Sequence, residues 1–349
     1  MVDKLLKLLL LVSPIAFTSG IKPEKFEVMF FHFGVIALFM TSLLDIPKRD
    51  NIPITREIVL FLFLCITSTA IHSFQMFSIG TLLNLFLSCF ALNLIYKYMG
   101  KPKQYYKYIT IAAIINIIVY LLQRYYFNFL PFIPANGAIN ANGGILGTNS
   151  RLANYLAIIT PTSFSYLWFL IPIVSILLHQ IPAIGIFMMV LGVKLCHRIK
   201  TEGDITYKVI GGLAFLSAMV FFWCYGKYIH QELNVRLFFI WQPMISEICK
   251  APLIGHGLGS YYAQVGTDPF NTYLAFTYDV GILGLTLIGY TLYRIRKYFD
   301  LSIASLSLIA VLSVSMIDYA IEIPRLWLTI IFIIAAFFIK QEETKNASN

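Results

Sequence analysis

Arg236 is the residue with the clearest capacity for chemistry, because it stands beside an aromatic cluster that includes Trp241. A guanidinium fork matches the oxygens of a phosphate group, so Arg236 is a candidate to bind a diphosphate. The alternative is an arginine that reaches from an apolar helix to lipid headgroups. The surrounding residues, 234–255, predict an amphipathic helix that ends at Pro252 and Gly255 and lies at a membrane interface.

The candidates to accept the proton of a substrate hydroxyl are His256, Asp268, Asp279 and Glu322. Asp279 and Glu322 lie in or beside apolar sequence, where an ionisable group is costly and marks a functional candidate. Asp268 could instead cap the following helix, and Glu322 could form an ion pair with Arg325 that joins two helices. His256 could be a plain turn residue, because the glycine-rich residues 255–260 allow a sharp turn and a close approach to a substrate or helix.

The histidines and cysteines predict no metal site, because the chain has no HxxxH pair and no CxxC pair. It also has no Walker A sequence, so we expect no ATP hydrolysis and no cofactor. Cys249 stands alone in a long loop and is predicted to be a small buried hydrophobe.

The composition places these residues in a membrane protein. Hydrophobic residues make up 58% of the 349 residues and charged residues only 12%, whereas a soluble domain carries roughly 25% charged residues. Continuous apolar runs such as 58–71 and 328–339 favour helices over a barrel, whose strands would alternate in polarity. We therefore predict an all-α polytopic bundle of about twelve membrane-spanning helices.

The predicted spans are 5–20, 26–45, 58–72, 79–97, 108–123, 151–166, 167–180, 182–197, 207–226, 271–293, 301–320 and 324–340. The first run could also be read as a signal peptide, but the spans that follow favour a membrane helix. Residues 151–197 must cross an odd number of times. Either three short spans with bends near Pro161, Pro172 and Pro182 or one span with a re-entrant pair satisfies this requirement.

The basic residues indicate how the chain is oriented. Most Lys and Arg fall in the segments 1–4, 45–57, 97–107, 194–208, 294–300 and 340–349, whereas acidic residues divide about evenly between the two faces. The formal net charge of +9 therefore collects on one face, which the positive-inside rule assigns to the cytoplasm together with both chain ends. Topology thus explains the basic charge, and no nucleic-acid partner is expected.

One membrane domain is predicted over residues 1–340. It carries a large periplasmic loop at about 227–270 and a smaller one, rich in Gly and Asn, at about 124–150. The polar residues 341–349 are predicted to form a disordered cytoplasmic tail. The long loop is the place where we expect function to concentrate, because loops on a rigid scaffold often carry binding and catalytic residues.

Several motifs in residues 145–340 follow one another in a characteristic order. They are Arg236 with its aromatic helix, APLIGHGLGS (251–260), FNTYL (270–274) and DVGILGL (279–285). In this order the chain resembles the O-antigen polymerase and ligase superfamily of the bacterial envelope. Ligases of this family carry a histidine at the position of Phe270 and an arginine in the region of residues 178–185, which has none here, so the resemblance favours a polymerase.

The resemblance implies a GT-C-like membrane glycosyltransferase that uses an undecaprenyl-diphosphate-linked oligosaccharide at the periplasmic face of the bacterial inner membrane. Diphosphate binding is expected of Arg236, Arg151 and Arg325, and contact with the glycan or shaping of the loop is expected of Trp241, Asn271 and Tyr273. A polymerase would transfer the glycan to a second lipid-linked repeat unit, with a chain-length regulator as a candidate partner. The alternatives are a ligase that transfers it to lipid A-core or protein, and a transporter or flippase without chemistry.

Overall fold

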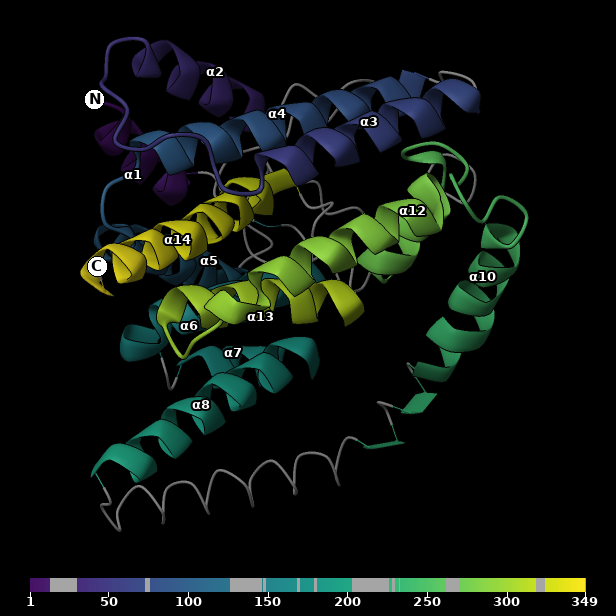
Figure 1. The fold of residues 1–349 in the computed structure, drawn as a ribbon. Coiled ribbons are helices and arrows are strands. Elements are labelled where there is room, and N and C mark those ends of the chain that lie inside the picture. The colour runs from purple at the N-terminus through teal and green to yellow at the C-terminus, as the bar shows by residue number, and fades with distance from the viewer. Residues whose placement is uncertain are drawn as a thin grey trace.

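The fold is known from a computed structural model that describes residues 1–12, 30–72, 76–125, 146, 149–167, 170–178, 181–202, 226–227, 230–231, 233–261, 270–317 and 324–348. Every regular element within these ranges is a helix, which confirms the all-α prediction for them (Figure 1). The longer helices are α1 (Val2–Val12), α2 (Phe30–Ser42), α3 (Thr55–Ile71), α4 (Met76–Tyr98), α5 (Tyr106–Tyr125), α6 (Asn149–Leu167), α7 (Leu170–Leu177), α8 (Ile181–Glu202), α12 (Thr272–Ile295), α13 (Ile303–Ile317) and α14 (Pro324–Ser348). Shorter ones are η2 (Pro102–Gln104), η4 (Arg236–Trp241), α10 (Gln242–Ile248) and η5 (Arg296–Tyr298).

Three helical stretches in the described part of the chain are long and apolar enough to cross a membrane. They are Ser78–Tyr98, Pro102–Leu122 and Thr272–Tyr298. A helix rises 1.5 Å per residue, so a stretch of roughly 20 residues matches the ~30 Å hydrocarbon layer. Shorter apolar helices occur at Phe31–Ser42, Ile184–Leu195 and Ile303–Met316.

The positions of the predicted spans agree with the helices, although the number of crossings stays a prediction. All but one of the predicted spans contain a described helix, and most of the remaining span, 207–226, lies outside the described residues. Residues 151–197 differ from the pattern of three similar spans. α7 has 8 residues, or about 12 Å, and is too short to cross alone. Pro161 lies inside α6 rather than at a bend between spans, and the number of crossings in residues 151–197 stays a prediction.

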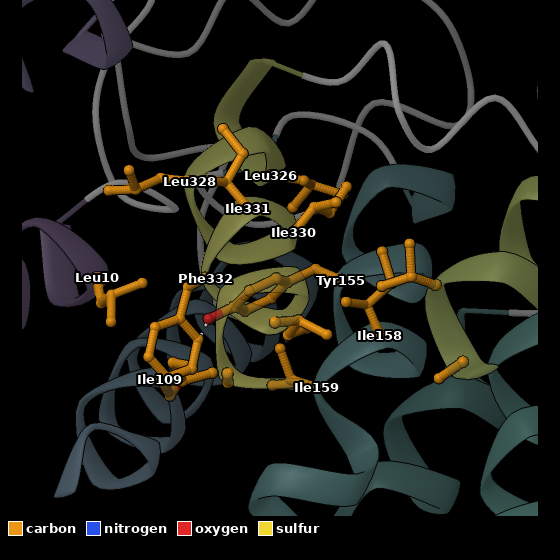
Figure 2. Close-up of a cluster of buried hydrophobic side chains, with 14 of the residues drawn as sticks. Leu10, Ile109, Tyr155, Ile158, Ile159, Leu326, Leu328, Ile330, Ile331 and Phe332 are labelled. Carbon is orange, nitrogen blue, oxygen red and sulfur yellow. Dashed lines mark hydrogen bonds between the residues drawn. The ribbon is translucent and has the colours of Figure 1, made fainter. Parts of the chain in front are cut away.

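Large apolar side chains on α1, α5, α6 and α14 form the centre of the bundle (Figure 2). Tyr155 and Phe332 are fully buried there, and the Tyr155 hydroxyl donates to the carbonyl of Ile109 at 3.3 Å. Lipid tails are as apolar as these side chains, so in a membrane such a core is held by close van der Waals packing rather than by release of water.

Charged contacts join several chain segments at one end of the bundle. The N-terminal ammonium contacts the Asp45 carboxylate at 2.6 Å, and Arg49 contacts Glu342 at 2.9 Å and the carbonyl of Met99 at 2.7 Å. Both chain ends lie on this side in Figure 1. Segments that the charge pattern assigned to one face of the membrane are therefore together in space.

The predicted disorder of the C-terminal tail is wrong for most of its length. α14 continues to Ser348, well beyond the apolar sequence. Two side chains of the tail are held in place, because Glu342 pairs with Arg49 and Gln341 donates to the carbonyl of Tyr298 at 2.5 Å. These partners are distant in sequence, so local composition does not reveal them.

Candidate functional site

Arg236 begins a stretch of unusual backbone in the helix of the long loop. η4 is a π-helical stretch that runs directly into α10. Pro243 lies in the first turn of α10 and lacks an amide hydrogen, so the regular hydrogen-bond ladder cannot run through this point. Short π-helical stretches often mark functional positions. The helix ends at Ile248, and Pro252 and Gly255 lie in the turns that follow, so the predicted end was several residues too late.

This loop helix, η4 with α10, packs one face against α12 and exposes another. Met244 and Ile248 are buried against a cluster that includes Tyr278 of α12. The other face exposes large apolar side chains, namely Leu237, Phe238, Phe239 and Ile245. An apolar face turned outward suits the predicted position at a membrane interface.

Cys249 corrects the prediction of a small buried hydrophobe. It follows Ile248 as the C-cap of α10 and is exposed. Successive helical residues point about 100° apart. The position that follows the buried Ile248 therefore turns away from α12.

The glycine-rich loop, residues 251–261, pairs with a break in α12. Gly281 has φ 75° and ψ −175° inside that helix. Across the break, Ile282 N donates to the carbonyl of Pro252 at 2.8 Å, and His256 N donates to the carbonyl of Tyr278 at 2.9 Å. The loop backbone thus supplies partners for groups that the broken helix leaves unpaired.

Two glycines allow the loop and α12 to approach each other this closely. A Cβ atom on Gly255 would lie 2.5 Å from the carbonyl carbon of Asp279, and one on Gly281 would overlap the carbonyl of Leu253. Both glycines also have positive φ, which costs other residues free energy. This confirms the prediction that the glycines serve a sharp turn and a close approach to a helix.

Asp279 holds this loop in place. Its carboxylate is buried and accepts hydrogen bonds from Gly259 N at 2.7 Å, Tyr261 N at 3.2 Å and the Ser260 hydroxyl at 3.2 Å. Its backbone carbonyl accepts from the Ser68 hydroxyl of α3 at 2.7 Å. A carboxylate of α12 that is surrounded by donors from the docked loop has a positioning role.

His256 is half-buried and has a defined tautomer. Its Nε2 lies 3.0 Å from the carbonyl oxygen of Glu247. A carbonyl only accepts hydrogen bonds, so Nε2 carries the hydrogen and the neutral ring has its lone pair at Nδ1. The ring packs against that of Tyr278, with centroids 4.5 Å apart and the planes tilted by 32°. His256 is therefore oriented with a basic nitrogen, as a proton acceptor requires.

His72, the C-cap residue of α3, joins this group, and it was not among the predicted site residues. Its ring centroid lies 6.1 Å from that of His256, and its Nδ1 lies 3.1 Å from the carbonyl of Ser68. The two histidines are far apart in sequence and meet only because α3 packs against α12. The one available signal was that a predicted span ended at residue 72 on the same face as the long loop.

Arg236 reaches the start of α12, at a point of backbone strain. Its guanidinium carbon lies 4.7 Å from the ring centroid of Phe270, a cation–π arrangement. Phe270 has φ 51°, which is rare for a bulky residue and costs free energy. The next residue, Asn271, caps α12 by accepting from Leu274 N at 3.0 Å. Arg236 thus lies where the amides and the dipole of a helix N-terminus favour an anion.

The remaining predicted residues have separate positions. Tyr273 donates its hydroxyl to the carbonyl of Leu312 at 3.2 Å and so connects α12 to α13. Trp241 is half-buried at the end of η4, and Arg151 is exposed in the first turn of α6, which packs against α5, α8 and α13. Arg325 lies in the first turn of α14, and its side chain is outside the described part of the structure. Asp268 and Glu322 also lie outside the described residues.

The described site therefore consists of two side chains that lie against α12 from the long loop. Arg236 of η4 contacts Phe270 just before the helix, and His256 of the glycine-rich loop contacts Tyr278 further along it. The axial distance from Thr272 to Tyr278 is about 9 Å. No protein-family model matches the chain, and no curated protein matches it. Within the described residues, fold and site together define an all-helical protein with helices of membrane-spanning length and a loop that docks on a broken helix.

Proposed function

We propose that this chain is a surface-polysaccharide polymerase of the bacterial inner membrane. It transfers glycan from an undecaprenyl-diphosphate-linked donor to a lipid-linked repeat unit at the periplasmic face. The observation that carries the proposal is the position of Arg236, which lies over Phe270 at the capped N-terminus of α12. His256 lies against Tyr278, further along that helix. A cation, helix amides and a base of fixed tautomer are the groups that transfer from a diphosphate requires.

The proposed reaction assigns a task to each of these groups. The diphosphate of the donor binds between Arg236 and the first turn of α12. The bond between the anomeric carbon and the phosphate oxygen breaks, and the diphosphate leaves with the bonding electrons. A hydroxyl oxygen of the acceptor sugar bonds to the anomeric carbon, and His256 takes its proton at Nδ1. Arg236 stabilises the negative charge that develops on the leaving group.

The docked loop supports this chemistry because it fixes the base before the substrate binds. Two hydrogen bonds hold His256. Its backbone amide donates to the carbonyl of Tyr278, and its ring donates to the carbonyl of Glu247. Gly257 N donates to the Ser68 hydroxyl at 3.1 Å, so α3 also holds the loop. A group held in its working geometry does not have to be reorganised during the reaction.

The distance between the site and the charged end supports a periplasmic location. Asn271 caps the N-terminus of α12, and Arg294 lies in its last turn, where it pairs with Glu57 of α3. With 24 residues, α12 covers about 36 Å, more than the hydrocarbon thickness. The chain ends lie at the basic end, so the positive-inside rule assigns them to the cytoplasm and the site to the other face.

A deletion strain tests this function directly. Surface glycan is separated on a gel after complementation with wild type, Arg236→Ala or Lys250→Ala. Lys250 is a matched control, because it is an exposed cation of the same loop whose ammonium pairs with Glu247 at 2.6 Å. The proposal predicts single repeats in the deletion strain and a ladder that wild type and Lys250→Ala restore but Arg236→Ala does not.

Other patterns would reject the polymerase in favour of a different class. Polymerised chains that accumulate on undecaprenol in the deletion strain would indicate a ligase, although Phe270 occupies the position of the ligase histidine. An unchanged ladder in the deletion strain would exclude both enzymes for this glycan and favour a transporter. Protein levels of each variant are measured in the membrane fraction, so that loss of function is separated from loss of the protein.

A further inference from the structure

A pocket of about 370 Å³ lies at the charged end of the bundle, far from the glycine-rich loop. It is bordered by α1, η2, α5, α6 and the start of α13. Its lining includes Lys7, Lys103, Gln104, Lys107, Thr162 and Ile303. A volume of this size suits a small ligand or a headgroup.

The cationic lining is only partly neutralised. Lys7 pairs with Asp3 at 2.5 Å, whereas Lys103 and Lys107 have no ion pair with any residue that the structure describes. Lys107 lies over the ring of Tyr108 with its ammonium 5.1 Å from the centroid. Glu343 of α14 is a further acidic group in the neighbourhood, since it acts electrostatically on the Tyr106 hydroxyl of this pocket. The three lysines and the two nearby acids, Asp3 and Glu343, together keep a net positive charge.

The pocket also lies at a defined level of the predicted membrane. The apolar stretch Pro102–Leu122 begins at η2, so Lys103 and Lys107 lie in its first turns. Lys103 is exposed, whereas Thr162 in the lining is buried. A pocket lined by several lysines at the end of an apolar span is the arrangement that binds anionic headgroups.

We infer that this pocket binds an anionic phosphate group, with Lys103 and Lys107 as its principal ligands. Lys7 orients the site through Asp3, and the Gln104 amide adds a hydrogen-bond donor. The chemistry is that of a phosphodiester headgroup or of a soluble phosphate. The inference does not depend on the proposed glycan transfer, because none of these residues belongs to the site at the start of α12.

Native mass spectrometry of the purified full chain tests the inference. The chain is reconstituted with phosphatidylcholine and phosphatidylglycerol, and the retained lipids are counted for wild type and for the double variant Lys103→Gln and Lys107→Gln. Each lysine lost is expected to weaken retention of phosphatidylglycerol about 5-fold. Lys101→Gln is the matched control, since Lys101 is an exposed cation beside η2 that does not line the pocket.

Glu343→Gln adds a variant whose expected effect is a gain. Removal of a nearby acid should strengthen retention of phosphatidylglycerol, which a misfolded protein would not show. Saturable binding of inorganic phosphate that needs both lysines but displaces no lipid would support the anion site and assign it to a soluble ligand. Equal retention of phosphatidylglycerol by wild type and the double variant, with no lysine-dependent binding of phosphate, would overturn the inference.

Discussion

Asp279→Asn is expected to release the glycine-rich loop from α12. The substitution keeps the shape of the side chain and exchanges one carboxylate oxygen for an NH2 group. At present Oδ1 accepts from Tyr261 N and the Ser260 hydroxyl, and Oδ2 accepts from Gly259 N. An amide that keeps its oxygen at the Oδ1 position turns its NH2 group toward the Gly259 amide, so that two donors face each other.

The magnitude follows from this lost hydrogen bond. A hydrogen bond to a charged group contributes about 1.5–3 kcal/mol, and an unsatisfied buried donor costs a similar amount. We expect the docked loop to lose about 2–3 kcal/mol, or roughly 30–150-fold in the ratio of docked to released loop. Ser260→Ala removes only the hydroxyl contact at 3.2 Å and should cost about 1 kcal/mol or less.

Hydrogen exchange of the loop amides measures this ratio. The amides of Gly257, Gly259 and Tyr261 are bonded to side chains or backbone in the docked loop, so they exchange only when it opens. Asp279→Asn should speed their exchange by the factor above and leave amides of α5 unchanged. Unchanged exchange of these loop amides in Asp279→Asn would refute the positioning role.

Three further predictions concern the same loop, the base and the charged end. Gly281→Ala should destabilise the docked loop by at least 1–2 kcal/mol because of its positive φ, whereas Gly289→Ala in the same helix meets open space and should be neutral or stabilising in thermal unfolding; equal effects would contradict the proposed close approach. His256→Gln should lower the initial rate of polymerisation about 100-fold or more without releasing the loop in hydrogen exchange, and a normal rate would exclude His256 as the base. Burial raises the pKa of Asp300, but hydrogen bonds from Ser302 and Ser305 outweigh it and hold that pKa below 3.8. The contribution of the Asp300 carboxylate to the free energy of unfolding is therefore complete above about pH 4 and is lost as pH falls through the lowered pKa. Wild type and Asp300→Asn should differ in denaturant unfolding at neutral pH and converge in acid. A difference that stays constant with pH would contradict the assignment.

The helices were predictable because their signal is local. Long apolar runs must satisfy their own backbone hydrogen bonds in lipid, so runs such as 58–71 and 79–97 correspond to α3 and α4. The glycine at 255 was also informative, since positive φ and close approach are properties that glycine alone supplies at low cost. The break at Gly281 was not predicted.

The features that could not be predicted depend on contacts between distant segments. The tail is helical to Ser348, and the ion pair between Glu342 and Arg49 holds it in place. Cys249 is exposed because the neighbouring Ile248 is the residue that packs against α12. A single sequence carries the residue types in these contacts and not their partners.

The site was predicted in part for the same reason. Arg236 and His256 were identified from residue type and motif order, and Asp279 was identified as costly in apolar sequence. The sequence could not show that Asp279 would be surrounded by donors of the glycine-rich loop, or that His72 would lie beside His256. The first fact depends on the docking of the loop on α12, and the second on the packing of α3 against α12.

Turnover of a lipid-linked repeat unit by the purified chain tests the central claim most directly. Wild type and Lys250→Ala should form products with more than one repeat and release undecaprenyl diphosphate. Arg236→Ala should lose about 10–150-fold in kcat/KM, because the charge-assisted bonds to the leaving group contribute about 1.5–3 kcal/mol. Equal kcat/KM for Arg236→Ala and wild type would contradict the account, as would a wild-type chain that binds the donor and forms no product.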